Sequence, residues 1–264
     1  MPLLLGTNID SLVEASIRGK IARVGGTVDQ LVTYRNCFVE DINIPDGGFG
    51  KVLHPGVAAM LPRMKRYIKQ ELKFFVHGPR ILRDRKTLVL DMHDASKHKE
   101  LHGKYDCSIS SNLLEHSPNP IMLLLNFHFV TREQGFQFHA IPHYAYTYDR
   151  FRMPTPLEHM IEDFEKGADA SDHSHVEDYR QSAIEKDGWQ RQFHEKYPLE
   201  YPFIHYHVFD EHNTRALFEH VFQKVTNDIY KTDRFSDNVV IASNMLNPVF
   251  AENYRRVLQE MENR

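Results

Sequence analysis

The middle of the chain limits the fold more than any other part of it. Tyr105–Ser111 has the apolar content of a buried strand, and residues 136–141 have the same content. Between them, Asn119 and Pro120 occupy the N-cap and first-turn positions of an apolar helix that runs to about residue 130. Two strands that are joined by a helix of this length pair in parallel. The pattern therefore predicts a βαβ unit.

The same alternation continues on both sides, which is typical of an α/β fold. We expect one domain over residues 1–264, with a Rossmann-like, doubly wound and mostly parallel sheet. Residues 150–201 are polar and aromatic and give no strand signal, so a helical cap insertion is expected there. Ligands of such sheets bind beyond the carboxyl ends of the strands. The further strands are expected at residues 31–39, 73–77, 87–91, 203–209 and 238–242, and the further helices at 11–18, 57–72, 155–167, 213–225 and from 247 onward.

Composition excludes several classes of protein. The 264 residues are 41% hydrophobic and 26% charged, as in a soluble globular protein. The net charge is −4 and no basic stripe is present, so we expect no nucleic-acid partner. Two cysteines make no disulfide framework, and the longest apolar run is too short to cross a bilayer. These features predict a cytoplasmic protein without membrane insertion, with a homodimer as an open possibility.

A resemblance rests on three stretches of the chain. Residues 105–120 resemble the fourth strand and following turn of class I S-adenosylmethionine (SAM)-dependent methyltransferases, in which an acidic-apolar strand leads into a Leu-Glu-His segment, here Leu114-Glu115-His116. Residues 147–164 and 205–209 resemble a subgroup of this family that accompanies bacterial surface-polysaccharide genes. The resemblance covers a little under half of the chain. It implies SAM as the cofactor and a small-molecule or sugar-containing acceptor.

The glycine-rich cofactor loop of that family is not recognisable. The one candidate, Gly47-Gly48-Phe49-Gly50, follows a proline in a polar stretch, and we interpret it as a surface loop in preference to a cofactor loop. Either the SAM loop is built unusually, or the chain is a cofactor-less relative that binds a partner or a glycan.

The resemblance implies four cofactor-facing residues. Asp91 and Asp94 follow a predicted strand, where a carboxylate would accept hydrogen bonds from ribose or adenine, and capping of the next segment is the alternative role of Asp94. Ser110 and Asn112, with Ser111 between them, stand where the central strand ends. Simple turn chemistry would also favour these residue types.

The acceptor side is predicted from residues that follow the next strand. His116 and His143 come after successive strands and should line the same crevice, and we select His143 as the general base for a sugar hydroxyl. Asp149 and His159 are expected to orient the acceptor. Arg150 and Arg152 would suit a phosphate or carboxylate. The aromatic residues of this region would stack on sugars or pack beneath a lid; they are Tyr144, Tyr146, Tyr148, Phe151, Tyr197, Tyr201 and Phe203.

The 17 histidines also raise the question of a metal. His205 and His207 alternate on a predicted strand and should project from one face, where an Asp or Glu could complete a zinc site. Asp172, His173 and His175 form a second cluster on a predicted loop. Spacing of this kind is weakly specific, so no metal ligand is assigned and a divalent metal stays an open possibility. The function predicted first is methyl transfer from SAM to an oxygen of a sugar or polysaccharide intermediate; a metal-dependent hydrolase built on His205 and His207 is the alternative chemistry.

Overall fold

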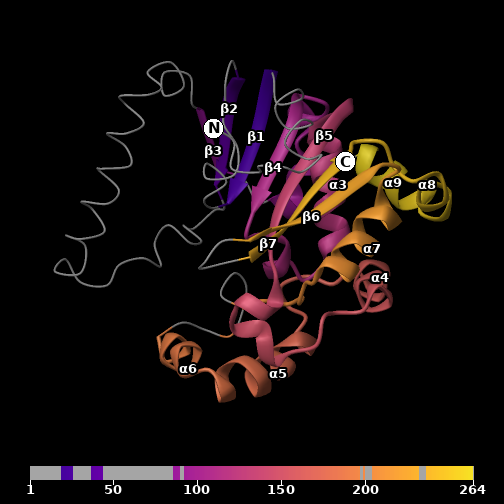
Figure 1. The fold of residues 1–264 in the computed structure, drawn as a ribbon. Helices are drawn as coiled ribbons and strands as arrows, with labels where there is room; N and C mark the ends of the chain where they lie inside the picture. The colour runs from indigo at the N-terminus through magenta and orange to yellow at the C-terminus, as the bar shows by residue number, and fades with distance from the viewer. Residues whose placement is uncertain are drawn as a thin grey trace, which may run out of the picture.

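A seven-stranded sheet forms the centre of the molecule (Figure 1). The computed structural model describes residues 19–25, 37–43, 86–89, 92–196, 199, 204–231 and 236–263. The strand order is β3-β2-β1-β4-β5-β7-β6. The strands are β1 (Gly19–Gly25), β2 (Cys37–Asn43), β3 (Lys86–Val89), β4 (Tyr105–Ser111), β5 (Thr131–Pro142), β6 (Val225–Lys231) and β7 (Ser236–Ser243).

The first five strands run parallel, and the order reverses between β1 and β4. β1 pairs with β2 on one side and with β4 on the other, in register from Ile21 opposite Cys107 to Gly25 opposite Ser111. β2 pairs with β3, and β4 pairs with β5, both in parallel. This is the arrangement of a doubly wound sheet, so the expected fold class is confirmed.

The predicted βαβ unit is present. Helix α3 (Pro120–Val130) joins β4 to β5, and the Asn119 side chain accepts a hydrogen bond from the Met122 amide as its N-cap. The helix is buried on nearly all sides. Its apolar residues therefore fill the centre of the core rather than one stripe of a surface helix.

The far edge of the sheet is antiparallel. β7 pairs antiparallel with β5 and with β6. The chain reaches this hairpin from helix α7 (Glu211–Val221), which the Asp210 side chain caps. The prediction had α7 starting at Asn213 and continuing to residue 225, and it had no strand at β6. Asn213 is instead the N3 member of a capping box with Asp210.

The N-terminal third is described only in its strands. β1 was not predicted, and β2 overlaps only the end of the strand expected at residues 31–39. β3 matches the expected strand at 87–91 to within two residues. The helices expected at 11–18 and 57–72, the strand at 73–77, Gly47–Gly50 and Asp91 lie outside the described residues.

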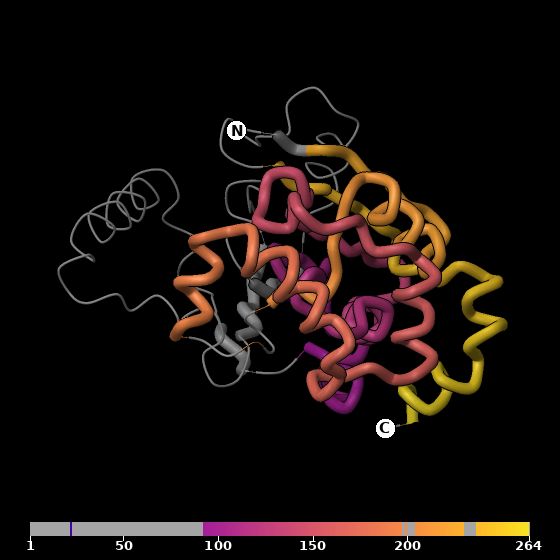
Figure 2. Tube along the Cα trace, turned by 90° about the horizontal axis from the view of Figure 1, so that it is seen from below, coloured from indigo at the N-terminus to yellow at the C-terminus, as the bar shows by residue number. Residues whose placement is uncertain are grey.

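A group of short helices lies beyond the carboxyl ends of β4 and β5 (Figures 1 and 2). Figure 2 looks at this end of the molecule, with these helices nearest the viewer. We call residues 143–196 the cap. Its elements are η8 (Tyr144–Tyr146), η9 (Tyr148–Phe151), α4 (Leu157–Lys166), α5 (Ser174–Tyr179), the π-helical turn η10 (Arg180–Ile184) and α6 (Gly188–His194).

Two local predictions in this region are wrong. Residues 204–209 form no strand; they run as irregular chain between the cap and α7. Helix α4 begins at Leu157, two residues after the expected start at residue 155, and its N-cap Pro156 provides no side-chain hydrogen bond. The Thr155 hydroxyl instead accepts a hydrogen bond from the Val208 amide. The C-terminal end of α4 is as predicted, at Gly167 with φ 69°.

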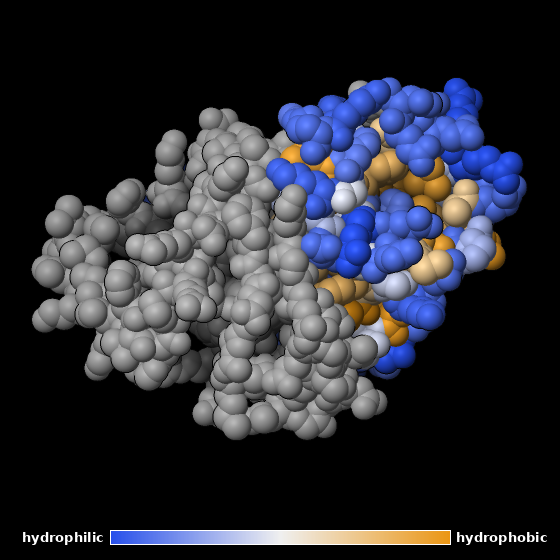
Figure 3. Space-filling view, turned by 90° about the horizontal axis from the view of Figure 1, so that it is seen from above, coloured by the Kyte–Doolittle hydropathy of each residue, from blue (hydrophilic) through white to orange (hydrophobic). Residues whose placement is uncertain are grey.

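The remaining elements follow β3, β4 or β7 in the sequence. Hydrophilic residues cover most of the described part of the face seen in Figure 3, with hydrophobic residues showing between them. No helix in the described ranges is long and apolar enough to cross a membrane. The remaining elements of the fold are η5 (Met92–Lys97), η6 (Lys99–Leu101), η7 (Leu114–His116), α8 (Pro248–Asn253) and α9 (Arg255–Asn263).

Candidate functional site

The carboxyl ends of β1 and β4 meet where the strand order reverses. Gly25 ends β1 directly opposite Ser111, and the sequence continues with Gly26. Open α/β sheets bind ligands at such a switch point. A glycine there has no Cβ, so a ligand can approach the backbone closely.

Asn112 lies at the same switch point, immediately after β4. It has φ 52°, in the left-handed region that asparagine tolerates better than most residues. Its amide N–H donates to the Ala140 carbonyl, and the Ser111 hydroxyl donates to its Oδ1. The Asn112 side chain is exposed, so its amide group faces outward where a ligand of this sheet would lie.

Ser110 lies in the interior, away from the position predicted for it. Its hydroxyl is 2.7 Å from His139 Nδ1, and His139 Nε2 is 3.0 Å from Gln137 Oε1. Gln137 continues the network to Asn244. Ser110 is buried and lies opposite His139 in the pairing of β4 with β5, so its side chain belongs to this buried network.

Asp94 lies in η5, which follows β3 in the sequence and packs against α3. It forms an ion pair of 2.6 Å with Lys97, one turn later, and both side chains are half exposed. The adjacent His93 reaches Ser117 Oγ at 2.9 Å, and its carbonyl accepts from Asn126 of α3. These contacts hold η5 beside the segment that follows β4. A cofactor contact by Asp94 stays a prediction.

A buried carboxylate–imidazole pair lies between the cap and residues 204–209. Asp149 of η9 accepts a hydrogen bond from His205 Nδ1 at 2.5 Å. Arg152 donates to the other Asp149 oxygen at 2.9 Å and to the carbonyls of His205 and Tyr206. Burial alone would raise the pKa of Asp149, but the facing His205 and Arg152 hold that pKa below its ordinary value. The Arg152 guanidinium thus bonds to groups of the protein itself and is not free to bind an acceptor phosphate.

His205 is oriented as a general base would be. Since the Asp149 carboxylate only accepts, Nδ1 of His205 carries the proton and Nε2 of the neutral ring presents a lone pair. No hydrogen bond to that Nε2 is made by the described residues. The Tyr148 ring lies 4.5 Å from the imidazole, centroid to centroid, and fixes its plane.

Glu115 and His116 of η7 lie against this pair. The His116 and His205 rings meet edge to face at 4.6 Å, and His116 Nε2 is 3.7 Å from Glu115 Oε1. Burial raises the pKa of the Glu115 carboxyl well above its ordinary value, and the negative charge of Asp149 adds to this rise. Burial lowers the pKa of His116 well below its ordinary value. The two carboxyls are therefore driven to opposite states, Glu115 neutral and Asp149 ionised.

His143, the base selected from sequence, has both ring nitrogens engaged. Nδ1 accepts a hydrogen bond from the Ala145 amide at 3.2 Å, as the N-cap of η8. Nε2 lies 3.0 Å from Glu211 Oε2. A ring that donates from one nitrogen and accepts at the other has no lone pair left for an acceptor hydroxyl. His116, expected to line the same crevice, lies against His205 and Glu115.

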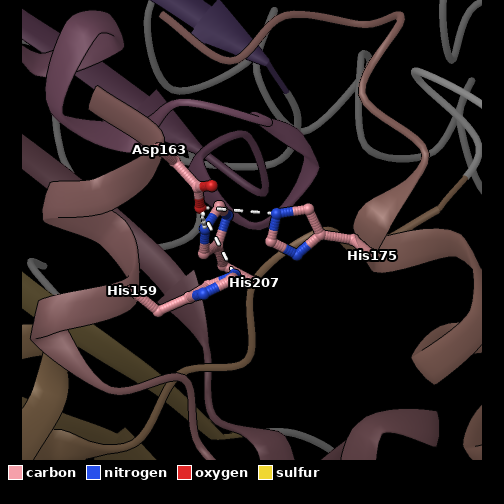
Figure 4. Close-up of side chains that lie close together, drawn as sticks. All are labelled: His159, Asp163, His175 and His207. Atoms are coloured by element: carbon pink, nitrogen blue, oxygen red, sulfur yellow. Dashed lines mark hydrogen bonds and ion pairs between the residues drawn. The ribbon is translucent and has the colours of Figure 1, made fainter. Parts of the chain in front are cut away.

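His205 and His207 diverge into different clusters instead of forming one site. His207 joins His159, Asp163 and His175 (Figure 4). His159, expected to orient an acceptor, is thus 3.5 Å from Asp163. Of the second sequence cluster only His175 takes part; His173 is exposed, and Asp172 accepts from the Ser174 amide. The alternative of a metal-dependent hydrolase built on His205 and His207 is therefore not supported, because the two histidines do not share one site.

Sequence reasoning missed three carboxylates, Glu115, Asp163 and Glu211. Glu115 was considered only as part of a family motif, and Glu211 was not considered. Asp163 carried a usable signal: it follows His159 by four residues, and such residues share one face of a helix.

Comparison with known proteins gives structural likeness only. No family model matches the chain, and no curated protein matches it. The CMeT domain of the citrinin polyketide synthase matches with 10% identity and TM-score 0.43, over 90% of this chain and 50% of that one. The trans-methyltransferase CalH in complex with S-adenosylhomocysteine (SAH) matches with 13% identity and TM-score 0.41, over 89% and 54%.

A third match is a SAM-dependent methyltransferase from Methanosarcina mazei, with 12% identity and TM-score 0.43, over 86% of this chain and 93% of that one. The chain thus spans about half the length of the first two structures and nearly all of the third. The strand order, not these likenesses, defines the fold of this chain. Its structural neighbours are SAM-dependent methyltransferases.

Proposed function

We propose that this chain is a SAM-dependent methyltransferase that transfers a methyl group to an oxygen of a sugar-containing acceptor. The switch point between β1 and β4 is the observation that carries this proposal, because Gly25 faces Ser111 there and Asn112 projects outward. The resemblance of residues 105–120 to methyltransferases of class I falls on the same strand and turn.

The residues at this point fit the amino-acid part of SAM. Glycine at the end of β1 leaves space for close backbone approach, and the Asn112 amide offers both a donor and an acceptor. When bound, SAM would supply an electrophilic methyl group on a sulfonium. Asp94, with Asp91 before it in the sequence, is the candidate for the nucleoside part.

His205 is the proposed general base, in place of His143. It lies beyond the carboxyl end of β4, because its ring contacts His116 of η7, four residues after Asn112. Asp149 fixes the tautomer of His205 and would stabilise the imidazolium that forms when a hydroxyl proton is taken. Asp149 is therefore proposed as a positioning residue for the base.

The acceptor side of the proposal rests on exposed groups of the cap. Tyr146 and Phe151 are exposed, and Arg150 lies over the Phe151 ring at 4.5 Å while it pairs with Asp187. Aromatic faces stack on sugar rings, and a guanidinium binds phosphate. A nucleoside-diphosphate sugar has both features.

The test is formation of SAH from SAM by the purified full chain with nucleoside-diphosphate sugars and free oligosaccharides as acceptors. We expect a methylated sugar to be identified by mass spectrometry, and His205→Gln to lower its rate of formation by about 100-fold or more. His143→Gln is the matched variant and should retain most activity. The role of His205 is refuted if His143→Gln abolishes turnover while His205→Gln does not, and methyl transfer is refuted if no acceptor oxygen is methylated.

A further inference from the structure

We propose that His159, Asp163, His175 and His207 bind one Zn²⁺ ion, which holds the cap to the body of the protein. Figure 4 shows the four side chains pointing toward one another from three separate segments. His159 and Asp163 come from α4, His175 from α5, and His207 from the segment before α7. This site is independent of the proposed methyl transfer.

The distances within the cluster match tetrahedral zinc. The Nε2 atoms of His207, His175 and His159 lie 3.0, 3.4 and 3.5 Å from the same atom, Asp163 Oδ2. The four ligand atoms all lie within 4.8 Å of one another. Zinc bonds of about 2.0–2.1 Å in a tetrahedron separate the ligand atoms by roughly 3.3 Å. The cluster therefore needs only small movements to close around an ion.

The hydrogen bonds of the His207 ring leave a place for a cation between that ring and Asp163. His207 Nδ1 is 2.9 Å from the Ser117 carbonyl oxygen, which only accepts, so this nitrogen carries a proton. In the neutral ring, Nε2 then turns a lone pair toward the Asp163 carboxylate. Two acceptors that face each other at 3.0 Å repel, and a cation between them converts the repulsion into two bonds.

His175 supplies an independent observation. Its side chain is more than nine-tenths buried, and apart from the 3.4 Å approach to Asp163 Oδ2, which is not a hydrogen bond, its Nε2 has no partner in the described part of the chain. A buried imidazole nitrogen without a partner is costly. Its lone pair would be satisfied as the third ligand of the ion.

The surroundings resemble those of other zinc sites. A zinc-ligating histidine commonly donates its second ring N–H to a backbone carbonyl, as His207 does to Ser117. Four protein ligands close the coordination shell, which is typical of structural rather than catalytic zinc. His159 is 38% exposed at its side chain, so the ion can enter from that side. The ion would join α4 and α5 to residues 204–209, which the contact of His207 with Ser117 ties to the turn after β4.

The experiment uses the full chain, purified without chelator. Metal content is measured by plasma mass spectrometry, and Zn²⁺ affinity by competition with a chromophoric chelator. We expect one zinc per chain, and removal by EDTA should lower the melting temperature, because a bound ion stabilises only the folded state. Co²⁺ added to the metal-free protein should give the intense visible absorption of four-coordinate cobalt.

The variants are His159→Gln and His175→Gln, each expected to weaken zinc by about 100-fold or more. His173→Gln and His212→Gln change exposed histidines outside the cluster and should leave zinc affinity unchanged. If His175→Gln fails to fold, the half-exposed His159 still allows the test. Zinc that is absent, or whose affinity is the same in His159→Gln and in the controls, would overturn the proposal.

Discussion

At the scale of single residues, Asp149 carries most of the proposed chemistry. Its carboxylate accepts from His205, Arg152 and the Thr147 hydroxyl. This one group therefore fixes the tautomer of the base and neutralises a buried guanidinium. Both tasks need a negative charge, which the lowered pKa of Asp149 preserves to acidic pH.

Asp149→Asn should lower kcat by about 100-fold to 10,000-fold, because the amide no longer enforces the reactive tautomer of His205. SAM affinity should stay unchanged, since Asp149 does not lie at the switch point. Asp178→Asn is the matched control: Asp178 accepts from Arg152 Nε on the exposed side and does not contact His205. A loss of kcat in both variants alike would show that Asp149 acts only through Arg152.

His139 couples stability to pH. Burial lowers its pKa to about 3, so the folded chain leaves it neutral while the unfolded chain protonates it near pH 6.5. Its contribution to the free energy of unfolding is complete above that pH. It should fall by up to about 1.4 kcal/mol per pH unit as the pH drops below 6.5 toward 3.

Urea unfolding at pH 7, 6 and 5 measures this effect. In His139→Gln the loss of stability per pH unit should be smaller by about 1.4 kcal/mol, because one proton fewer is bound on unfolding. His116, whose pKa burial also lowers, adds to the slope in both proteins. His212→Gln, at an exposed site, should keep the full slope. Equal slopes for His139→Gln and the unmodified chain would contradict the interpretation.

The sequence singled out some residues of the candidate site but not the residues that they contact. Asp149 was singled out by a family motif, yet its partner His205 is 56 residues away and is brought to it by the cap. Ser110 and Asn112 are two residues apart and were given one role. Ser110 lies opposite His139 of β5 and bonds to it, whereas Asn112 lies beyond the end of β4 and its side chain is exposed.

At the scale of elements, the start of α4 depends on a long-range contact instead of a local cap. Thr155 Oγ1 accepts from the Val208 amide, the Thr155 amide donates to the Val208 carbonyl, and the Thr155 carbonyl accepts from Asn213. The sequence around Thr155 looks like an N-cap, and nothing local reveals that Val208 competes for the hydroxyl. Asn119 meets no such competitor, so its predicted cap is confirmed.

Thr155→Val should destabilise the fold by about 1–3 kcal/mol, because the Val208 amide is left buried without an acceptor. Thr155→Ser keeps the oxygen and should stay within about 0.5 kcal/mol of the unmodified chain. Chemical denaturation of the two variants checks this. Equal losses in both would mean that packing of the Thr155 methyl group, not its hydroxyl, stabilises this junction.

At the scale of the whole molecule, the strand order places the site. The middle of the chain predicted the doubly wound sheet, since a capped helix between two apolar strands has few other solutions. β1 was not predicted because glycine and charged residues are unusual in a central strand. The strand is defined by its pairing with β2 and β4. β6, rich in Asn, Asp and Lys, is likewise defined by its pairing with β7.

Titration of the full chain with SAH in a calorimeter tests the central claim most directly, because the claim requires a cofactor site at the switch point. We predict micromolar binding, with stabilisation of about 2.7 kcal/mol when SAH is 100-fold above its Kd. Asn112→Gly, which keeps the left-handed backbone and removes the amide, should bind SAH more weakly. An absence of heat and of any shift in melting temperature with SAH and with SAM would contradict the account.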